Sequence, residues 1–207
     1  TALNTLVCLV KPGSKIITIE ETAELNLPQE NWVSLIARQS YGLGGTNVGE
    51  VTLFDLVKTS MRHRPDILIV GEVRGQEAYV LFQALATGHG GMCTMHAENL
   101  DSAVKRLTQK PMEISPAYIP LMNIVFSIQR VHLTKNNQKK AYRRVITVNE
   151  IADYEDYRAI FKWNPIKDEH IIDLDNSLML SSVSERQGIT KKELLEEIGR
   201  RKDTLHW

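Results

Sequence analysis

Two kinds of hydrophobic pattern alternate along the first half of the chain. Short apolar stretches predict strands, and apolar residues spaced three and four apart predict helices. The predicted strands cover residues 16–20, 32–37, 66–70 and 91–97, and the predicted helices cover residues 3–10, 53–61 and 78–85. Strands that alternate with helices predict an α/β fold, with a mainly parallel sheet and helices on both faces.

The pattern changes in the second half of the chain. Alternating stretches at 124–133 and 143–151, joined by a polar turn, predict an antiparallel hairpin, and residues 156–165 predict an edge strand. Thr190 and Glu193 form a capping box that predicts a helical C-terminal appendage. The expected domains are an α/β domain at 1–151 and a strand-and-helix appendage at 152–207.

Composition and charge narrow the class of protein. The chain has 207 residues with 25 Lys or Arg and 25 Asp or Glu, so its zero net charge does not favour nucleic acid as a partner. Apolar runs are far shorter than the roughly 18 residues of a membrane-spanning helix, and we expect no secretory signal. Cys8 and Cys93 form neither a disulfide framework nor a zinc motif. These features predict a cytosolic protein that binds no nucleic acid.

The most informative stretch is RHRPDILIVGEVRGQE at 62–77. Ligands of open α/β sheets bind outside the carboxyl ends of the strands, and Glu72 stands at that end of the strand at 66–70. A carboxylate there can position a water molecule or hold the hydration shell of a magnesium ion. The alternative is a strand that ends in an acidic residue by chance. The buried strand, the Gly-Glu pair, and Arg74 and Glu77 at the start of the next helix together favour a functional site.

A second cluster is ATGHGGMCTMHA at 86–97, which presents His89, Thr94 and His96 at strand ends. The histidines lack the helical spacing and the accompanying thiolates of a zinc site, so we expect no metal ligation by them. Taken without its neighbours, His96 is better explained as a hydrogen-bonded core residue.

A third cluster is ITIEETAEL at 17–25, where Glu20, Glu21 and Glu24 follow a buried strand. Their carboxylates can reach the same edge of the sheet as Glu72, although three glutamates alone are also typical of a solvated surface. The glycine-rich stretch at 41–49 is not followed by Gly-Lys-Ser or Gly-Lys-Thr. The chain therefore contains no phosphate-binding lysine loop.

Together and in this order, the three clusters resemble motifs of the secretion and pilus-assembly ATPases, the traffic ATPases of type II secretion, type IV pili and the archaellum. IEETAEL resembles their acidic box, ILIVGEVRG their Walker B motif, and ATGHGGMCTMHA their histidine box. The archaeal branch is the most similar, and the similarity covers essentially the whole chain.

The resemblance implies a RecA-like ATPase domain that assembles as a homo-hexamer, uses ATP and Mg²⁺, and acts on a polytopic membrane platform protein of a pilus or secretion system. It implies a cytoplasmic location, peripheral at the inner face of the cell membrane. It also places the Walker A loop immediately upstream of Thr1. We therefore expect a chain that begins just after that loop and is inactive alone. A non-hydrolysing ring or scaffold subunit of the same machinery is the alternative.

The resemblance also assigns roles to individual residues. Glu72 is implied to polarise the attacking water, with Arg62 and Arg64 as arginine-finger candidates across the ring. His96 is implied to contact the γ-phosphate side. The other implied members of the nucleotide and magnesium shell are Glu20, Glu21, Glu24, Arg74, Thr94 and His89, with magnesium held through water by Glu20, Glu21 and Glu72. Two departures from the family pattern are Glu21, where Asp is usual, and Ala23, where a basic residue is common.

Overall fold

The structure is a computed structural model that describes residues 2–38, 49–135 and 138–205. The chain divides into two compact units, Thr1–Leu121 and Met122–Trp207. Most of the glycine-rich stretch predicted at 41–49 lies outside the described residues.

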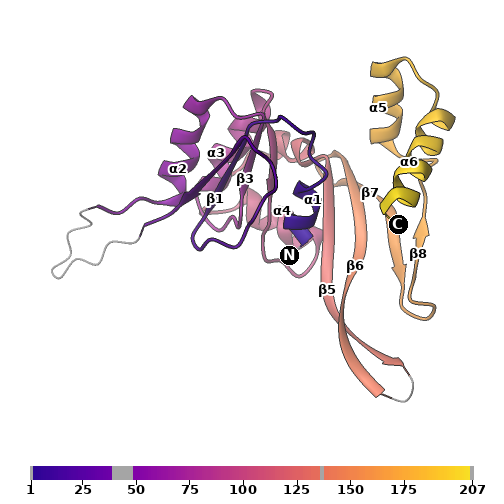
Figure 1. The fold of residues 1–207 in the computed structure, drawn as a ribbon. Helices are drawn as coiled ribbons and strands as arrows, with labels where there is room; N and C mark the ends of the chain where they lie inside the picture. Colours follow the sequence, from indigo (N-terminus) through magenta and orange to yellow (C-terminus); the bar gives the residue numbers. More distant parts are fainter. Residues whose placement is uncertain (1, 39–48, 136–137, 206–207) are drawn as a thin grey trace. The chain divides into compact units, whose positions relative to one another are not determined.

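The first unit contains a four-stranded parallel sheet in the order β2-β1-β3-β4 (Figure 1). Its strands are β1 (Ile16–Glu20), β2 (Trp32–Ile36), β3 (Ile67–Val70) and β4 (Gly90–Cys93). All five residues of β1 are buried, because this strand is central and covered on both faces. The buried Thr18 hydroxyl accepts a hydrogen bond from Trp32 Nε1 at 2.9 Å, so its burial leaves no polar group unpaired.

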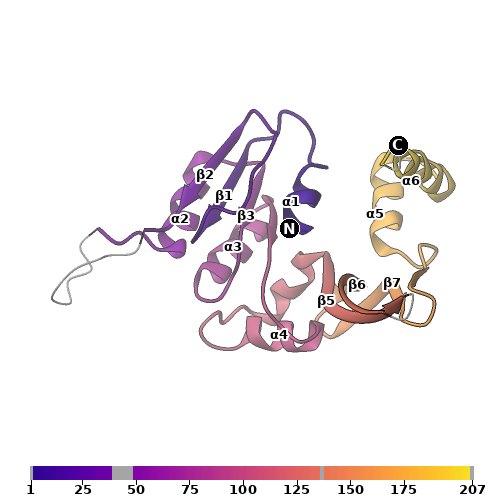
Figure 2. The same ribbon diagram turned by 60° about the horizontal axis from the view of Figure 1, so that its bottom comes forward.

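Helices cover both faces of this sheet (Figure 2). On one face, α1 (Ala2–Val7) packs Leu3 and Val7 against Ile16 and Ile69. On the other face lie α2 (Leu53–Ser60) and α3 (Glu77–Ala86). A side chain at Gly91 of β4 would meet Leu85 of α3 at 2.6 Å, so this glycine allows the helix to approach the strand closely.

Short segments connect these elements. A single 3₁₀ turn, Met61–His63, follows α2, and the helix α4 (Leu100–Thr108) follows β4. A longer 3₁₀ segment, Pro116–Met122, leads out of the first unit. Asn99 caps α4 by accepting a hydrogen bond from Ser102 N. This helix is an addition to the elements predicted from the sequence.

The second unit contains an antiparallel sheet in the order β5-β6-β7-β8. Its strands are β5 (Ile124–Lys135), β6 (Gln138–Asp153), β7 (Asp156–Asn164) and β8 (Glu169–Ile172), and the helices α5 (Leu178–Gln187) and α6 (Lys191–Leu205) follow them. Buried Glu150 accepts hydrogen bonds from Ser177 Oγ and Leu178 N, which attaches the start of α5 to β6.

The parallel sheet with helices on both faces, the hairpin and the helical end confirm the predicted α/β fold class. The compact units divide before β5, whereas the expected domain boundary lies after residue 151. The difference arises because β6 continues past residue 151 and pairs with both β5 and β7, so the hairpin belongs to the second unit.

Candidate active site

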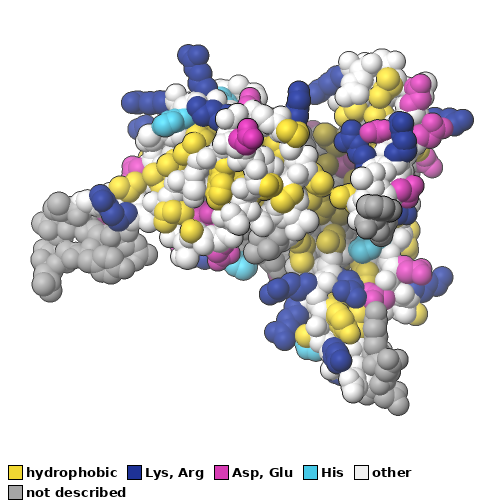
Figure 3. All heavy atoms as spheres, in the orientation of Figure 1, with side chains coloured by type: hydrophobic (Ala, Val, Ile, Leu, Met, Phe, Trp, Pro, Cys, Tyr) yellow, Lys and Arg dark blue, Asp and Glu magenta, His cyan; other side chains and the backbone are white. Residues whose placement is uncertain are grey.

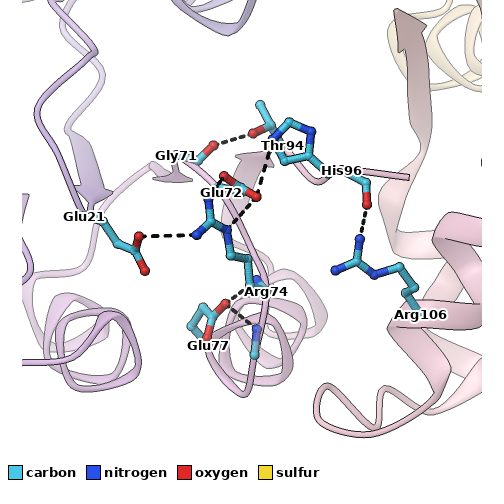
Figure 4. Close-up of polar contacts among 9 residues, drawn as sticks. Glu21, Gly71, Glu72, Arg74, Glu77, Thr94, His96 and Arg106 are labelled. Carbon is cyan, nitrogen blue, oxygen red and sulfur yellow. Dashed lines mark hydrogen bonds and ion pairs between the residues drawn. The ribbon is translucent and has the colours of Figure 1, made fainter. Parts of the chain in front are cut away.

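Three strands of the parallel sheet end side by side. In the register of the sheet Ile19 pairs with Val70, and Val70 pairs with Cys93. The segments that follow β1, β3 and β4 therefore start from one edge of the sheet. Glu21, Glu72 and His96, one from each of the three predicted clusters, come together there (Figure 4).

Arg74 binds the carboxylate of Glu72 in a bidentate arrangement. Arg74 Nε donates to Glu72 Oε1 at 2.7 Å, and Arg74 Nη2 donates to Glu72 Oε2 at 2.6 Å. Arg74 Nη1 also lies 3.6 Å from Glu21 Oε2, so the guanidinium bridges two carboxylates from neighbouring strands. The side chain of Glu72 is 25% exposed, which leaves the pair open to solvent on one side.

This arrangement lowers the pKa of Glu72, mainly through the hydrogen bonds from Arg74 and with smaller contributions from the charges of Arg74, His96 and Arg106. Burial opposes this effect but does not overcome it. The same hydrogen bonds raise the pKa of Arg74. Glu72 is therefore ionised at neutral pH, and both of its oxygens are engaged by one cation.

The backbone that carries this pair is anchored by Glu77. Glu77 is 7% exposed, and its Oε1 accepts hydrogen bonds from Arg74 N at 2.6 Å and from Gly75 N at 2.7 Å. A buried carboxylate thus satisfies two amide groups at the turn into α3. The sequence pattern places Glu77 at the start of a helix but does not predict it as a site residue.

A second set of contacts joins the segment after β4 to the segment after β3. Thr94 Oγ1 donates to Gly71 O at 2.5 Å, and Val73 N donates to Thr94 O at 2.9 Å. The side chain of His96 is 86% exposed, and its Nε2 lies 3.7 Å from Glu72 Oε1. This exposure excludes the alternative in which His96 is a buried core residue.

Arg106 of α4 completes the cluster and was missed from the sequence. Its Nη1 donates to the backbone oxygen of His96 (Figure 4). The interaction ties α4 to the segment that presents the His96 ring. A capped, amphipathic stretch at 100–108 was the available signal for this helix.

Glu20 and Glu24 are placed differently from Glu21. Glu20 is buried, and its Oε1 accepts hydrogen bonds from Glu24 N and Leu25 N, both at 3.1 Å. Glu20 Oε2 is buried with no hydrogen-bond partner among the described residues. Glu24 is exposed in the loop after β1, where its amide rather than its carboxylate contacts the cluster.

Three predicted site residues lie at the other end of the strands. Arg62 and Arg64 precede β3 and are exposed, and Arg64 ends the 3₁₀ turn with a positive φ of 50°. His89 precedes β4, and its Nδ1 lies 3.3 Å from both Ala84 O and Thr87 Oγ1. Within one chain the structure therefore does not bring these side chains to Glu72.

The carboxylates at this edge fit a magnesium ion only through water. No group of three or more His, Cys, Asp or Glu side chains in the described ranges could hold a metal ion directly. Arg74 also occupies both oxygens of Glu72. The orphaned Oε2 of Glu20 fits an indirect arrangement, because a buried carboxylate oxygen needs a donor such as a metal-bound water.

Comparison with known proteins identifies the family. The model of the family described as Type II/IV secretion system protein matches residues 1–165. The chain belongs to this family. Among the residues that the structure describes, no helix is both long and apolar enough to cross a membrane.

Individual relatives agree with this assignment. The protein MJ1287 of Methanocaldococcus jannaschii is 36% identical over 211 aligned residues, which cover 99% of this chain and 75% of that protein. Protein VirB11 of Agrobacterium fabrum is 36% identical over 108 residues, which cover 52% of this chain and 30% of that protein. The predicted membership of the traffic ATPases, with archaeal relatives, is confirmed.

The crystal structure of the VirB11 ATPase from the Brucella suis type IV secretion system shares the fold. It superposes with a TM-score of 0.51 and 22% sequence identity, covering 68% of this chain and 42% of that chain. At this identity the likeness concerns the fold alone.

Proposed function

We propose that this protein is the ATP-hydrolysing part of a hexameric motor that powers protein secretion or the assembly of a type IV pilus-like filament. The observation that carries the proposal is the convergence of Glu21, Glu72, Thr94 and His96 at one edge of the sheet, in a chain of the Type II/IV secretion system family. We further propose a homo-hexameric ring and a polytopic membrane platform as its partner, with the protein held at the cytoplasmic side of the membrane.

Glu72 is proposed to orient and polarise the water that attacks the γ-phosphate. In the structure both of its oxygens accept hydrogen bonds from Arg74, so Glu72 is free to act only when this guanidinium turns to another anion. A nucleotide phosphate is such an anion, because it matches the fork of a guanidinium. Binding of ATP and release of Glu72 are then one event.

The remaining predicted residues take supporting roles. Glu21, Glu72 and the orphaned oxygen of Glu20 would hold Mg²⁺ through its waters, and the ion would neutralise charge on the phosphates. Thr94, whose hydroxyl donates to Gly71 O, would hold the segment that carries His96, and His96 would face the γ-phosphate side. Glu24 and Arg74 remain proposed members of the nucleotide shell, whereas His89 lies at the opposite end of β4 from Glu72 and could reach a nucleotide only across a subunit interface.

Arg62 and Arg64 lie at the opposite end of β3 from Glu72, so an arginine finger made by them must act on a neighbouring subunit. Rings that mix an Arg64→Ala subunit with a Glu72→Gln subunit test this role. We expect some recovered hydrolysis at interfaces that pair an intact arginine with an intact glutamate. The absence of recovery in mixed rings confirmed by mass would exclude a role across the ring.

The proposal is tested by hydrolysis assays on the full natural chain with ATP and Mg²⁺. Glu72→Gln should lower turnover by about a hundredfold or more while nucleotide binding is kept, because the amide retains the size but loses the charge. The matched control is Glu30→Gln, an exposed carboxylate in the loop before β2, which should hydrolyse normally. Turnover close to wild type in Glu72→Gln would refute the assignment.

His96→Ala separates the functional role of this side chain from a structural one. Because the ring is 86% exposed, its removal should reduce hydrolysis and leave the melting temperature near that of the wild type. The alternative of a non-hydrolysing ring subunit is suggested by the absence of Gly-Lys-Thr or Gly-Lys-Ser from these 207 residues. A full natural chain that assembles but never hydrolyses ATP would establish that alternative.

A further inference from the structure

Most of the β5–β6 hairpin, residues 124–149, carries charge of one sign only, and the acidic residues Glu150 and Asp153 lie at the end of β6. Residues 124–149 contain six Lys or Arg and no Asp or Glu, although the whole chain is neutral. The rest of the chain therefore has an excess of six acidic residues. Figure 3 shows Lys and Arg side chains gathered along this hairpin, which Figure 1 labels β5 and β6 in the same orientation.

Three basic residues, Arg130, Lys139 and Arg143, share one face of the hairpin, whereas Lys140 and Arg144 belong to the other face. In its register Arg130 lies opposite Arg143, and Thr134 lies opposite Lys139, while His132 extends the same face between them. All five of these residues are exposed. Side chains directly opposite each other in an antiparallel pair point to the same side, so the two arginines face solvent together.

Two like charges at one cross-strand position destabilise a hairpin. Among the described residues, neither the Arg130 nor the Arg143 guanidinium has an ion-pair partner. Arg144 on the other face is different: its Nε and Nη2 pair with Asp168 at 2.7 and 2.9 Å, and it lies 5.1 Å from the centre of the Tyr142 ring. Arg144 is thus paired within the fold, whereas no ion pair in the described part of the chain engages Arg130 or Arg143.

The same face becomes apolar toward the start of β5. Ile124, Phe126 and Ile128 alternate with Arg130 and His132 along one side of the strand, and they are 38%, 42% and 42% exposed. One surface of the hairpin therefore presents an apolar half followed by a basic half. We call it the hairpin face, made up of these five residues together with Thr134, Lys139 and Arg143.

We propose that the hairpin face binds a membrane surface that contains anionic lipids. The basic half would contact headgroup phosphates, and the apolar half would enter the boundary with the acyl chains. This inference deepens the membrane association in the proposed function. It stands on the hairpin alone and requires neither nucleotide nor hydrolysis.

Two observations favour a lipid surface over other anionic partners. Arg143 and Lys139 belong to β6, an interior strand of the sheet, so a peptide that added to the β5 edge would leave them unused. A nucleic acid would engage the basic half through its phosphates and would leave Phe126 and Ile128 exposed. A lipid interface uses both halves.

The test is sedimentation of the full chain, without ATP, with vesicles of phosphatidylcholine mixed with phosphatidylglycerol. We expect binding that weakens as salt increases, because the attraction is screened. Arg130→Gln with Arg143→Gln should bind about thirtyfold more weakly, since each basic residue near an anionic surface contributes about a fivefold change. The conservative pair Arg130→Lys with Arg143→Lys should bind like the wild type.

The matched control is Arg200→Gln with Arg201→Gln on α6, which removes the same charge from two side chains that are 76% and 77% exposed. This pair should bind vesicles normally. If both double variants lost vesicle binding equally, the effect would come from net charge rather than from the hairpin face, and the proposal would be overturned. Equal binding to vesicles of pure phosphatidylcholine would overturn it too, as would tighter binding to a mixed-sequence oligonucleotide. None of these measurements depends on ATP hydrolysis. They can therefore refute lipid binding without refuting the proposed function.

Discussion

Replacing Glu77 with Ala should loosen the loop that carries Glu72. The Glu77 carboxylate is the acceptor for two backbone amides, Arg74 N and Gly75 N, at 2.6 and 2.7 Å. A hydrogen bond to a charged group contributes about 1.5–3 kcal/mol, and these two share a single oxygen in a partly buried position. We therefore expect the loop to lose about 2–3 kcal/mol of local stability, without disruption of the sheet behind it.

The assay is hydrogen exchange at the two amides that Glu77 holds. A local loss of about 2–3 kcal/mol corresponds to exchange that is about 30- to 150-fold faster at Arg74 and Gly75, with little change in β1 or β3. Glu77→Gln keeps an acceptor oxygen and should show a smaller increase. Unchanged exchange of both amides in Glu77→Ala would show that other contacts fix this loop, and the reasoning would be wrong.

Three further perturbations probe the fold and its charges. Arg74→Ala should raise the pKa of Glu72 toward its ordinary value of 4.5, which carboxyl-carbon NMR during an acid titration can measure. Because the pKa of Glu72 is lowered in the folded protein, its pairing with Arg74 stabilises the fold above the unfolded pKa. This contribution is lost as the pH falls through the folded pKa. Gly90→Ala should cost about 1–3 kcal/mol of unfolding free energy by denaturant titration, because a Cβ there would lie 2.9 Å from Asp66 O. Glu150→Ala should cost about 3 kcal/mol and increase exchange in α5, because it removes the acceptor for the start of that helix.

Matched variants separate these effects from general damage. Gly199→Ala adds the same methyl group in α6, where nothing lies within 4 Å, and should stabilise the helix by about 1 kcal/mol. Glu193→Ala removes the exposed carboxylate of the Thr190 capping box and should cost much less unfolding free energy than Glu150→Ala. A loss for Gly199→Ala as large as that for Gly90→Ala would contradict the steric argument.

The sequence predicts the position of Glu72 well because a single observation decides it. An uninterrupted aliphatic strand followed by Gly-Glu has only one way to lie in a parallel sheet, and the carboxyl edge follows from strand direction. The same reasoning applied to His89 would have placed it correctly. His89 precedes β4, which starts at Gly90, so strand direction sends it to the edge away from Glu72.

Other features depend on contacts that no local pattern contains. Glu20 and Glu21 are adjacent and chemically identical, yet one is buried and the other exposed, because Glu20 ends the buried strand β1 and accepts hydrogen bonds from the loop that follows, whereas Glu21 lies beyond the strand. The partnership of Arg74 with Glu72 requires the backbone turn that Glu77 holds. The extent of β6 depends on its pairing with both β5 and β7, and this pairing decides where the units divide.

The two hydrogen bonds between Thr94 and the segment at Gly71 and Val73 act as a mechanical coupling. A displacement of Thr94 must either carry the Glu72 backbone with it or break both bonds. Arg106 extends the same chain of contacts into α4 through the backbone of His96. A rotation of α4 would thus act as a lever on Glu72, so a force applied to this helix from outside could change the geometry of the carboxylate without touching it.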